Sequence, residues 1–189
     1  MMLARKHAWV AVGLVALVQS AVLGYMVWDR ASLLRNGRQI TLPIVPVDPR
    51  SLFRGDYVIL GYDIGQVEIP AELRPLPQGA VIYVTIASQP DGSWKVARVA
   101  RRHTPATGPD EAVLKGRLTY AIDQRGMNAR ASVRYGIESY FVPEGTGRPI
   151  EDMVQAKKMQ AIVAVGRDGR AAIAGLAVEG KPLVIEPRL

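Results

Sequence analysis

Five side chains that lie close together in the sequence could form a polar site: Arg134, Tyr135, Glu138, Tyr140 and Glu144. A carboxylate set among aromatic rings and an arginine can contact a ligand, and its pKa can be displaced far enough for acid–base chemistry. The same pattern is also typical of ion pairs and packed tyrosines at the rim of a β-strand. We favour the interpretation as a strand rim. We keep the five residues as a possible second site, in addition to the motif described below.

The residue types needed for most metal and nucleophilic chemistry are scarce in this chain. It has no cysteine and only two histidines, His7 and His103, so disulfides, thiolate metal sites and a cysteine nucleophile are excluded. His103 alone cannot form a histidine metal site or a Ser-His-Asp triad. Gly145 and Gly147 are not followed by the lysine of a phosphate-binding loop. The sequence therefore predicts no metal and no cofactor.

A buried strand is predicted between Gly55 and Ile64. Because side chains alternate along a strand, Val58, Leu60, Tyr62 and Ile64 share one apolar face, which we expect in the core. This face makes the segment the structural centre of the domain.

The residues before this strand predict a helical turn from Asp48 to Gly55, capped by the Asp48 carboxylate. Asp56 follows the turn as the one polar group beside the apolar run. We interpret its carboxylate as an acceptor for backbone N–H groups of the turn, or for Arg50 or Arg54. A catalytic role has less support because no partner group is visible.

The same stretch resembles the signature of the GDYXXLXYXI family, whose members are small membrane-anchored bacterial proteins of uncharacterised function. The resemblance in layout, one anchor and then one domain, covers nearly the whole chain, and residues 135–145 resemble a second shared segment. It implies a domain outside the cytoplasm and an association with a polytopic membrane protein, but no catalytic residue or ligand. The matching motif residues, with a structural or binding role, are Gly55, Asp56, Tyr57, Leu60, Tyr62 and Ile64.

Residues 8–28 carry no charge and predict a transmembrane helix, which at about 1.5 Å per residue is about 31 Å long, the thickness of the hydrocarbon core. Trp9, Tyr25 and Trp28 lie near its ends, as interfacial aromatic residues do. A cleaved signal peptide is less favoured because the run is long and lacks a good Ala-x-Ala site. The chain then divides into a cytoplasmic tail (1–7), a transmembrane anchor (8–28), a juxtamembrane linker (29–39) and an extracytoplasmic domain (40–189).

Basic residues flank both ends of the anchor and do not decide its orientation. A short tail before a large domain favours an inner-membrane protein with its domain in the periplasm or outside the cell. The arginines that follow the anchor, Arg30, Arg35 and Arg38, could contact lipid headgroups. Of the formal charge of +7, +4 belongs to residues 1–38, and the remainder gives no indication of nucleic-acid binding.

The domain is predicted to be mainly β, with α+β as the alternative: an antiparallel β-sandwich or open barrel with one helix. Three hairpins are expected around Pro90–Ser93, Gln124–Gly126 and Arg167–Gly169. The helix is expected at residues 150–159. Edge strands are expected at residues 40–47 and 182–186, because their prolines cannot donate to a ladder.

These features favour a binding function, in which a membrane-anchored domain meets a membrane-protein partner. Ser20 and Gly24 have a spacing that lets helices approach closely in lipid. One alternative is a small-molecule-binding module of the envelope, with a pocket at the barrel mouth lined by Tyr57, Tyr62 and Tyr140.

The other alternative is an enzyme, since the layout also resembles type I signal peptidases, which use a serine nucleophile and a lysine base. Ser51 and Lys95 are the nearest candidates. Ser51 is followed by Leu52-Phe53-Arg54 instead of the expected Met-x-Pro, and Lys95 follows a hairpin turn. The sequence therefore favours a non-enzymatic protein and leaves the Ser/Lys hydrolase as the less favoured alternative.

Overall fold

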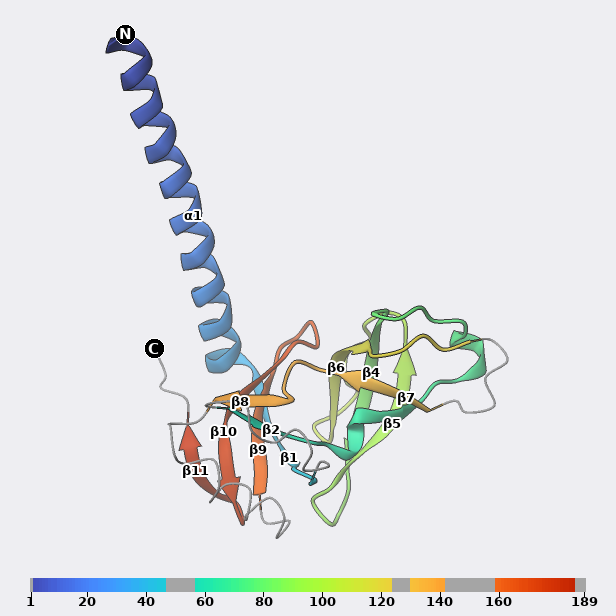
Figure 1. Cartoon of the computed structure of the whole chain (residues 1–189). Coiled ribbons are helices and arrows are strands. Elements are labelled where there is room, and N and C mark those ends of the chain that lie inside the picture. The colour runs from blue at the N-terminus through green and yellow to red at the C-terminus, as the bar shows by residue number, and fades with distance from the viewer. Residues whose placement is uncertain (1, 47–56, 124–129, 142–158, 186–189) are drawn as a thin grey trace.

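The computed structural model describes residues 2–46, 57–123, 130–141 and 159–185 (Figure 1). One long helix is followed by eleven strands, which confirms the mainly β prediction for the part of the chain described. Two short 3-10 helices, η2 (Asp63–Gly65) and η3 (Ala71–Leu73), interrupt the strands. In chain order the helix and strands are α1 (Met2–Asn36), β1 (Arg38–Pro43), β2 (Tyr57–Ile59), β3 (Gln66–Glu68), β4 (Val81–Ser88), β5 (Trp94–Ala100), β6 (Glu111–Leu118), β7 (Arg130–Arg134), β8 (Ser139–Phe141), β9 (Met159–Val165), β10 (Ala171–Val178) and β11 (Lys181–Ile185).

The described strands form three antiparallel sheets. Five strands pair in the order β3-β7-β6-β4-β5, four pair in the order β1-β9-β10-β11, and β2 pairs with β8. Two predicted hairpins are confirmed as β4–β5 and β9–β10. β6 pairs with β7 as predicted, while the turn expected at Gln124–Gly126 lies outside the described residues. The predicted edge strands are confirmed as β1 and β11. Figure 1 shows the five-stranded sheet beside the four-stranded sheet, with α1 rising from the β9–β10 side.

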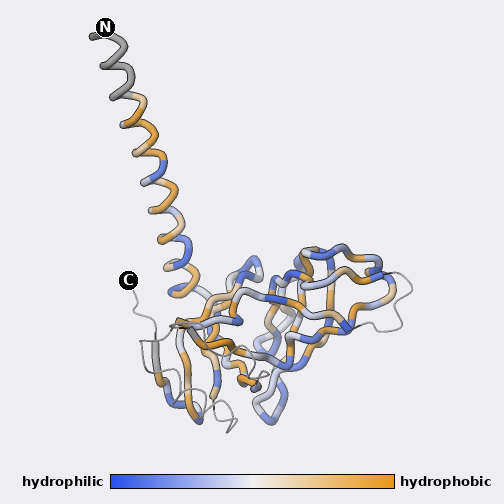
Figure 2. Tube along the Cα trace, viewed as in Figure 1, coloured by the Kyte–Doolittle hydropathy of each residue, from blue (hydrophilic) through white to orange (hydrophobic). Residues whose placement is uncertain are grey.

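The buried apolar side chains form one cluster to which all three sheets contribute. Alternate residues of β4 point into it, and Ile82, Val84 and Ile86 are each fully buried. Figure 2 shows the same division, with apolar residues along the inner strands and polar residues at many of the connecting turns. The shared core joins the sheets and encloses the motif segment between them.

The helix is long and apolar enough over Ala11–Asn36 to cross a membrane, and its most apolar part has no residue buried in the domain. Residues 29–39, where a juxtamembrane linker was expected, hold the last turns of α1, which continues to Asn36, and the start of β1 at Arg38. The reason is tertiary contact. Leu33 is half-buried and approaches Gly166, and the helix contacts β9 and β10.

Gly37 makes this direct connection possible. Its N–H donates to the Leu33 carbonyl oxygen at 2.8 Å and closes the helix. A Cβ at Gly37 would lie 2.4 Å from that oxygen and 3.1 Å from the Ala164 Cβ. Only glycine therefore lets the chain turn from α1 into β1 against the neighbouring strand.

The turn between β9 and β10 links the two larger sheets. The Lys115 N–H in β6 donates to the Gly169 carbonyl oxygen at 2.7 Å. Gly169 has φ +82°, which favours glycine, and a Cβ there would lie 3.1 Å from the Lys115 nitrogen. The predicted Arg167–Gly169 turn thus also serves as a contact between sheets.

The predicted motif strand is shorter than expected, while its buried face is confirmed. β2 ends at Ile59 because the chain changes partners: Gly61 forms an isolated bridge with Val45, and Asp63–Gly65 forms η2. The side chains of Val58, Leu60, Tyr62 and Ile64 are nevertheless all buried.

Two further predictions fall mainly outside the described residues. The turn at 48–55 lies wholly outside them. Of the helix predicted at 150–159, only Met159 is described, and it begins β9, so the predicted helix end is wrong by that residue.

Candidate functional site

The two segments that the sequence singled out meet in the structure. Val58 of β2 pairs with Tyr140 of β8, and Tyr57 pairs with Phe141. Just beyond this ladder, the Leu60 N–H donates to the Glu138 carbonyl oxygen at 2.9 Å. The motif and the possible second site are therefore one structural unit.

A reciprocal pair of tyrosine hydrogen bonds fastens this unit; we call it the tyrosine interlock. The Tyr62 hydroxyl donates to the Ile137 carbonyl oxygen at 2.9 Å, and the Tyr135 hydroxyl donates to the Ile64 carbonyl oxygen at 2.7 Å. Each tyrosine thus satisfies a backbone acceptor in the other's segment. Both side chains are buried, where an unsatisfied carbonyl would be costly.

Glu138 organises the turn that carries Tyr135. Its carboxylate accepts the N–H groups of Tyr135 at 2.5 Å and Gly136 at 3.0 Å. Gly136 has φ +81°, so the turn uses the left-handed conformation that glycine adopts readily. This arrangement agrees with a structural role for Glu138.

The ring of Tyr135 packs over Gly116 of β6. A Cβ at Gly116 would lie 3.0 Å from the Tyr135 Cε1 atom and 2.3 Å from the Val133 Cγ1 atom. The missing side chain therefore leaves the space that the Tyr135 ring occupies, and the interlock is fitted to the five-stranded sheet.

The environment keeps both phenols of the interlock neutral. Burial, and to a smaller degree the negative charge of Glu138, raises the pKa of Tyr62 and of Tyr135 well above the usual value. In the unfolded chain both should titrate near pH 10. The protonated phenols are hydrogen-bond donors, as the interlock requires.

These raised pKa values predict a loss of stability in alkali. Above about pH 10 the unfolded state releases two protons that the native state keeps, so the contribution is complete below that pH and falls as pH rises. The expected slope is about 1.4 kcal/mol per pH unit for each tyrosine. Urea titrations between about pH 9 and pH 11 should show it. The slope should be unchanged in Tyr120→Phe, whose ring is exposed, and clearly shallower in Tyr62→Phe/Tyr135→Phe. Equal slopes in all three proteins would contradict the assignment.

The remaining predicted site residues are dispersed or lie outside the described part. Arg134 ends β7 with an exposed side chain, whereas Tyr140 is buried. Gly55, Asp56 and Glu144 lie outside the described residues, and of Tyr57 only the backbone is described.

The pocket proposed for a small molecule at the tyrosines is not found among the described residues. Tyr62 and Tyr140 are buried, and the cavity that touches Tyr62 has a volume of only about 10 Å³. For the Ser/Lys hydrolase, Ser51 lies outside the described residues and Lys95 is exposed on β5. A lysine base is activated in a buried apolar pocket or beside another cation, and an exposed side chain does not lie in such a pocket. Within the described residues there is no group of three or more metal-binding side chains.

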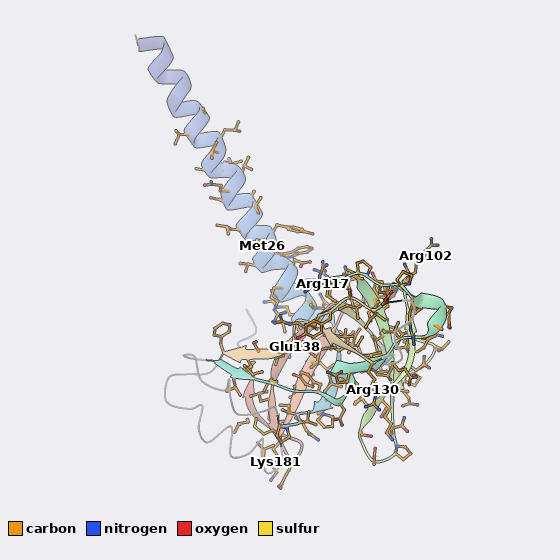
Figure 3. All side chains as sticks on the ribbon, turned by 45° about the vertical axis from the view of Figure 1, so that its right-hand side comes forward. Met26, Arg102, Arg117, Arg130, Glu138 and Lys181 are labelled. Carbon is orange, nitrogen blue, oxygen red and sulfur yellow. The ribbon has the colours of Figure 1, made fainter. Side chains whose placement is uncertain are left out.

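A larger cleft of about 710 Å³ lies between the foot of α1, β6, the turn after β7 and the start of β10. We call it the basic cleft, defined by its charged lining. Figure 3 shows Arg117 near the foot of the helix, whereas Arg130 and Lys181 lie farther from it. The cleft adjoins the interlock, because Tyr135 also lines it. Its charged residues are Asp29, Arg30, Lys115, Arg117, Arg134, Glu138 and Arg170.

Most of these charged residues were not singled out from the sequence, because they come from five separate segments of the chain. Arg30 was expected near lipid headgroups and lines the cleft. Arg38 had the same expectation, but it donates to the carbonyl oxygens of Pro109 and Glu111 instead. The only local signal for Lys115 and Arg117 is their i, i+2 spacing on a strand, which places both side chains on one face.

Comparisons with known proteins agree with the motif. A family model described as GDYXXLXY protein matches residues 19–176, which include the motif and most of the domain. No curated protein and no solved structure gives a significant match. The chain therefore belongs to the GDYXXLXY protein family.

Proposed function

We propose that this protein is a membrane-tethered module whose domain lies outside the cytoplasm and binds a membrane-protein partner. The observation that carries the proposal is the direct passage from α1 into β1, with only Gly37 between them. A flexible tether would need a polar or glycine-rich linker. A domain that packs directly on its own anchor keeps a fixed height and orientation relative to the bilayer. A surface that binds another membrane protein needs such a fixed position.

The ion pair between Asp29 and Arg170 supports this fixed orientation. Two Arg170 nitrogens contact the two Asp29 carboxylate oxygens at 2.5 and 3.0 Å, and Arg170 also contacts Asp168 at 2.5 Å. These contacts join α1 to the β9–β10 turn, which itself reaches β6 through Lys115. The anchor is thus connected to both larger sheets.

The surface of α1 supports a partner within the bilayer. Ser20 and Gly24 are one turn apart, and apart from the adjoining residues and the helix backbone no atom lies within 4 Å of a Cβ built at Gly24. Small residues at this spacing allow a second helix to approach closely. The location that we propose is the inner membrane of a bacterium, with the domain in the periplasm or outside the cell, as the resemblance to the GDYXXLXYXI family implies.

One crosslinking experiment tests both orientation and partner. A membrane-impermeant, amine-reactive crosslinker is added to intact spheroplasts, where it should reach the exposed Lys95 and Lys181. Mass spectrometry should then identify an adduct with a polytopic membrane protein. The adduct should be lost when α1 is exchanged for an unrelated transmembrane helix, and reduced when a flexible linker is inserted after Asn36.

The two parts of the proposal fail in different ways in this experiment. If the lysines react only after the membrane is permeabilised, the domain is cytoplasmic and the orientation is wrong. If the lysines react but only the monomer is recovered, the partner is wrong. If the linker variant crosslinks as well as the parent, the fixed docking of the domain is not what the partner requires.

A further inference from the structure

We infer that the basic cleft binds the phosphate headgroup of an anionic phospholipid from the leaflet in which α1 ends. The inference rests on the membrane anchoring in the proposed function, and it makes the lipid itself a ligand of the domain. It requires no partner protein.

The cleft lies at the depth of lipid headgroups when α1 spans a bilayer. The apolar run ends at Trp28, which is exposed and packs 6.2 Å from the Tyr25 ring between centroids. Such aromatic residues mark the membrane–water interface. Arg30 and Leu33 of the cleft lie about 3 and 7.5 Å farther along the helix axis. The headgroup layer is about 5–7 Å thick on each side of the hydrocarbon core, so this part of the cleft falls within or at the edge of that layer.

The two carboxylates of the cleft are already satisfied by other groups. Asp29 is held by two nitrogens of Arg170. Glu138 accepts the backbone N–H groups of Tyr135 and Gly136. Neither carboxylate therefore needs the remaining cations of the cleft as a partner.

Four of the cationic side chains remain available for an anion. Within the described residues, Arg30, Lys115, Arg117 and Arg134 form no ion pair with a carboxylate. Arg117 makes one long hydrogen bond, 3.3 Å, to the Gly79 carbonyl oxygen, which leaves most of its donors unused. An arginine guanidinium presents a planar fork that matches two phosphate oxygens. The cleft thus offers an excess of positive charge in the form that phosphate prefers.

Apolar surface beside the cleft indicates a lipid rather than a soluble anion. Leu33, which is half-buried, lines the cleft next to the charged groups. Directly above it, α1 exposes apolar side chains such as Met26 and Val27, and Figure 3 shows Met26 on the helix just above Arg117. A phospholipid can place its phosphate in the cleft and its acyl chains along the helix, whereas a soluble anion would leave the apolar part unused.

The test measures lipid binding to the full-length protein in detergent micelles. Phosphatidylglycerol or phosphatidylcholine is titrated, and native mass spectrometry measures the fraction of protein that carries one lipid. We expect phosphatidylglycerol to bind at least about fivefold more tightly, the effect of roughly one basic residue at an anionic surface. The Arg117→Gln/Arg134→Gln variant should lose most of this preference.

The matched control is Arg130→Gln/Lys181→Gln, which removes the same charge from positions farther from the helix (Figure 3). It should keep the parent's preference. Arg134→Lys keeps the charge but loses the planar fork, and should show an intermediate preference. This variant gives a readout even if the double cleft variant does not fold. An unchanged preference in Arg134→Lys and in the cleft variant, or an equal loss in the control, would overturn the inference.

Competition separates a lipid site from a site for soluble anions. Millimolar inorganic phosphate should not displace phosphatidylglycerol, because it lacks the apolar contacts; full displacement would overturn the lipid assignment. The outcome is also independent of the crosslinking experiment. Lipid preference without a crosslinked partner would refute only the proposed function, and a partner without lipid preference would refute only this inference.

Discussion

Replacing Leu60 with alanine is expected to lower the free energy of unfolding by about 2–5 kcal/mol, the range for a large-to-small change in a packed core. Leu60 is 1% exposed and belongs to the central apolar cluster. The substitution removes buried methyl groups and leaves a cavity, while the backbone hydrogen bond to Glu138 can remain. Urea unfolding of the full chain in detergent, followed through the fluorescence of Trp94, measures the change.

The control for this prediction is the same chemical change at an exposed leucine. Leu183 in the edge strand β11 is 43% exposed, and Leu183→Ala should change the free energy of unfolding by no more than about 0.5 kcal/mol. If Leu60→Ala and Leu183→Ala unfold at the same urea concentration, the motif leucine is not a core residue and the structural role of the motif is wrong.

Removing both hydroxyls of the tyrosine interlock is expected to have an effect of similar size. Tyr62→Phe leaves the buried Ile137 carbonyl oxygen without its donor, and Tyr135→Phe does the same to Ile64. An unsatisfied buried acceptor costs about 1–3 kcal/mol, so the double variant should lose about 2–6 kcal/mol. Both rings keep their volume, so the loss reports the hydrogen bonds rather than packing.

A double-mutant cycle tests whether the two tyrosines act together. Both bonds join the same two chain segments, and neighbouring groups of this kind are usually not additive. We therefore expect the double variant to differ from the sum of the single variants, while Tyr120→Phe, at an exposed ring, leaves stability unchanged. Two neutral single variants would show that the interlock does not stabilise the fold.

Both results would assign the described part of the motif to architecture rather than to chemistry. Leu60 packs the core, Tyr62 satisfies a distant carbonyl, and Ile64 provides the carbonyl that Tyr135 needs. The surface available for binding then lies elsewhere, at the basic cleft and along α1. Variants of the motif should reduce cellular activity only as far as they reduce folded protein.

Several features were predictable from the sequence because they depend on neighbouring residues. An uncharged run at 8–28 predicts a membrane-spanning helix, and Asp-Gly turns predict the hairpins β4–β5 and β9–β10. The alternation from Val58 to Ile64 predicts the buried face even though the strand ends early, since burial follows the side-chain period more than the hydrogen-bond ladder. Family membership also follows from this local pattern.

Other features depend on contacts between residues far apart in the chain, and only the tertiary structure decided them. Asp29 forms an ion pair with Arg170, which lies 141 positions later in the chain. This contact holds the end of α1 against the domain, and α1 continues to Asn36, where a linker was expected. Tyr62 and Ile137 meet across 75 positions, and the cations of the basic cleft come from α1, β6, β7 and the β9–β10 turn. No local period encodes such pairings, because they depend on which strands lie side by side once the shared core is buried.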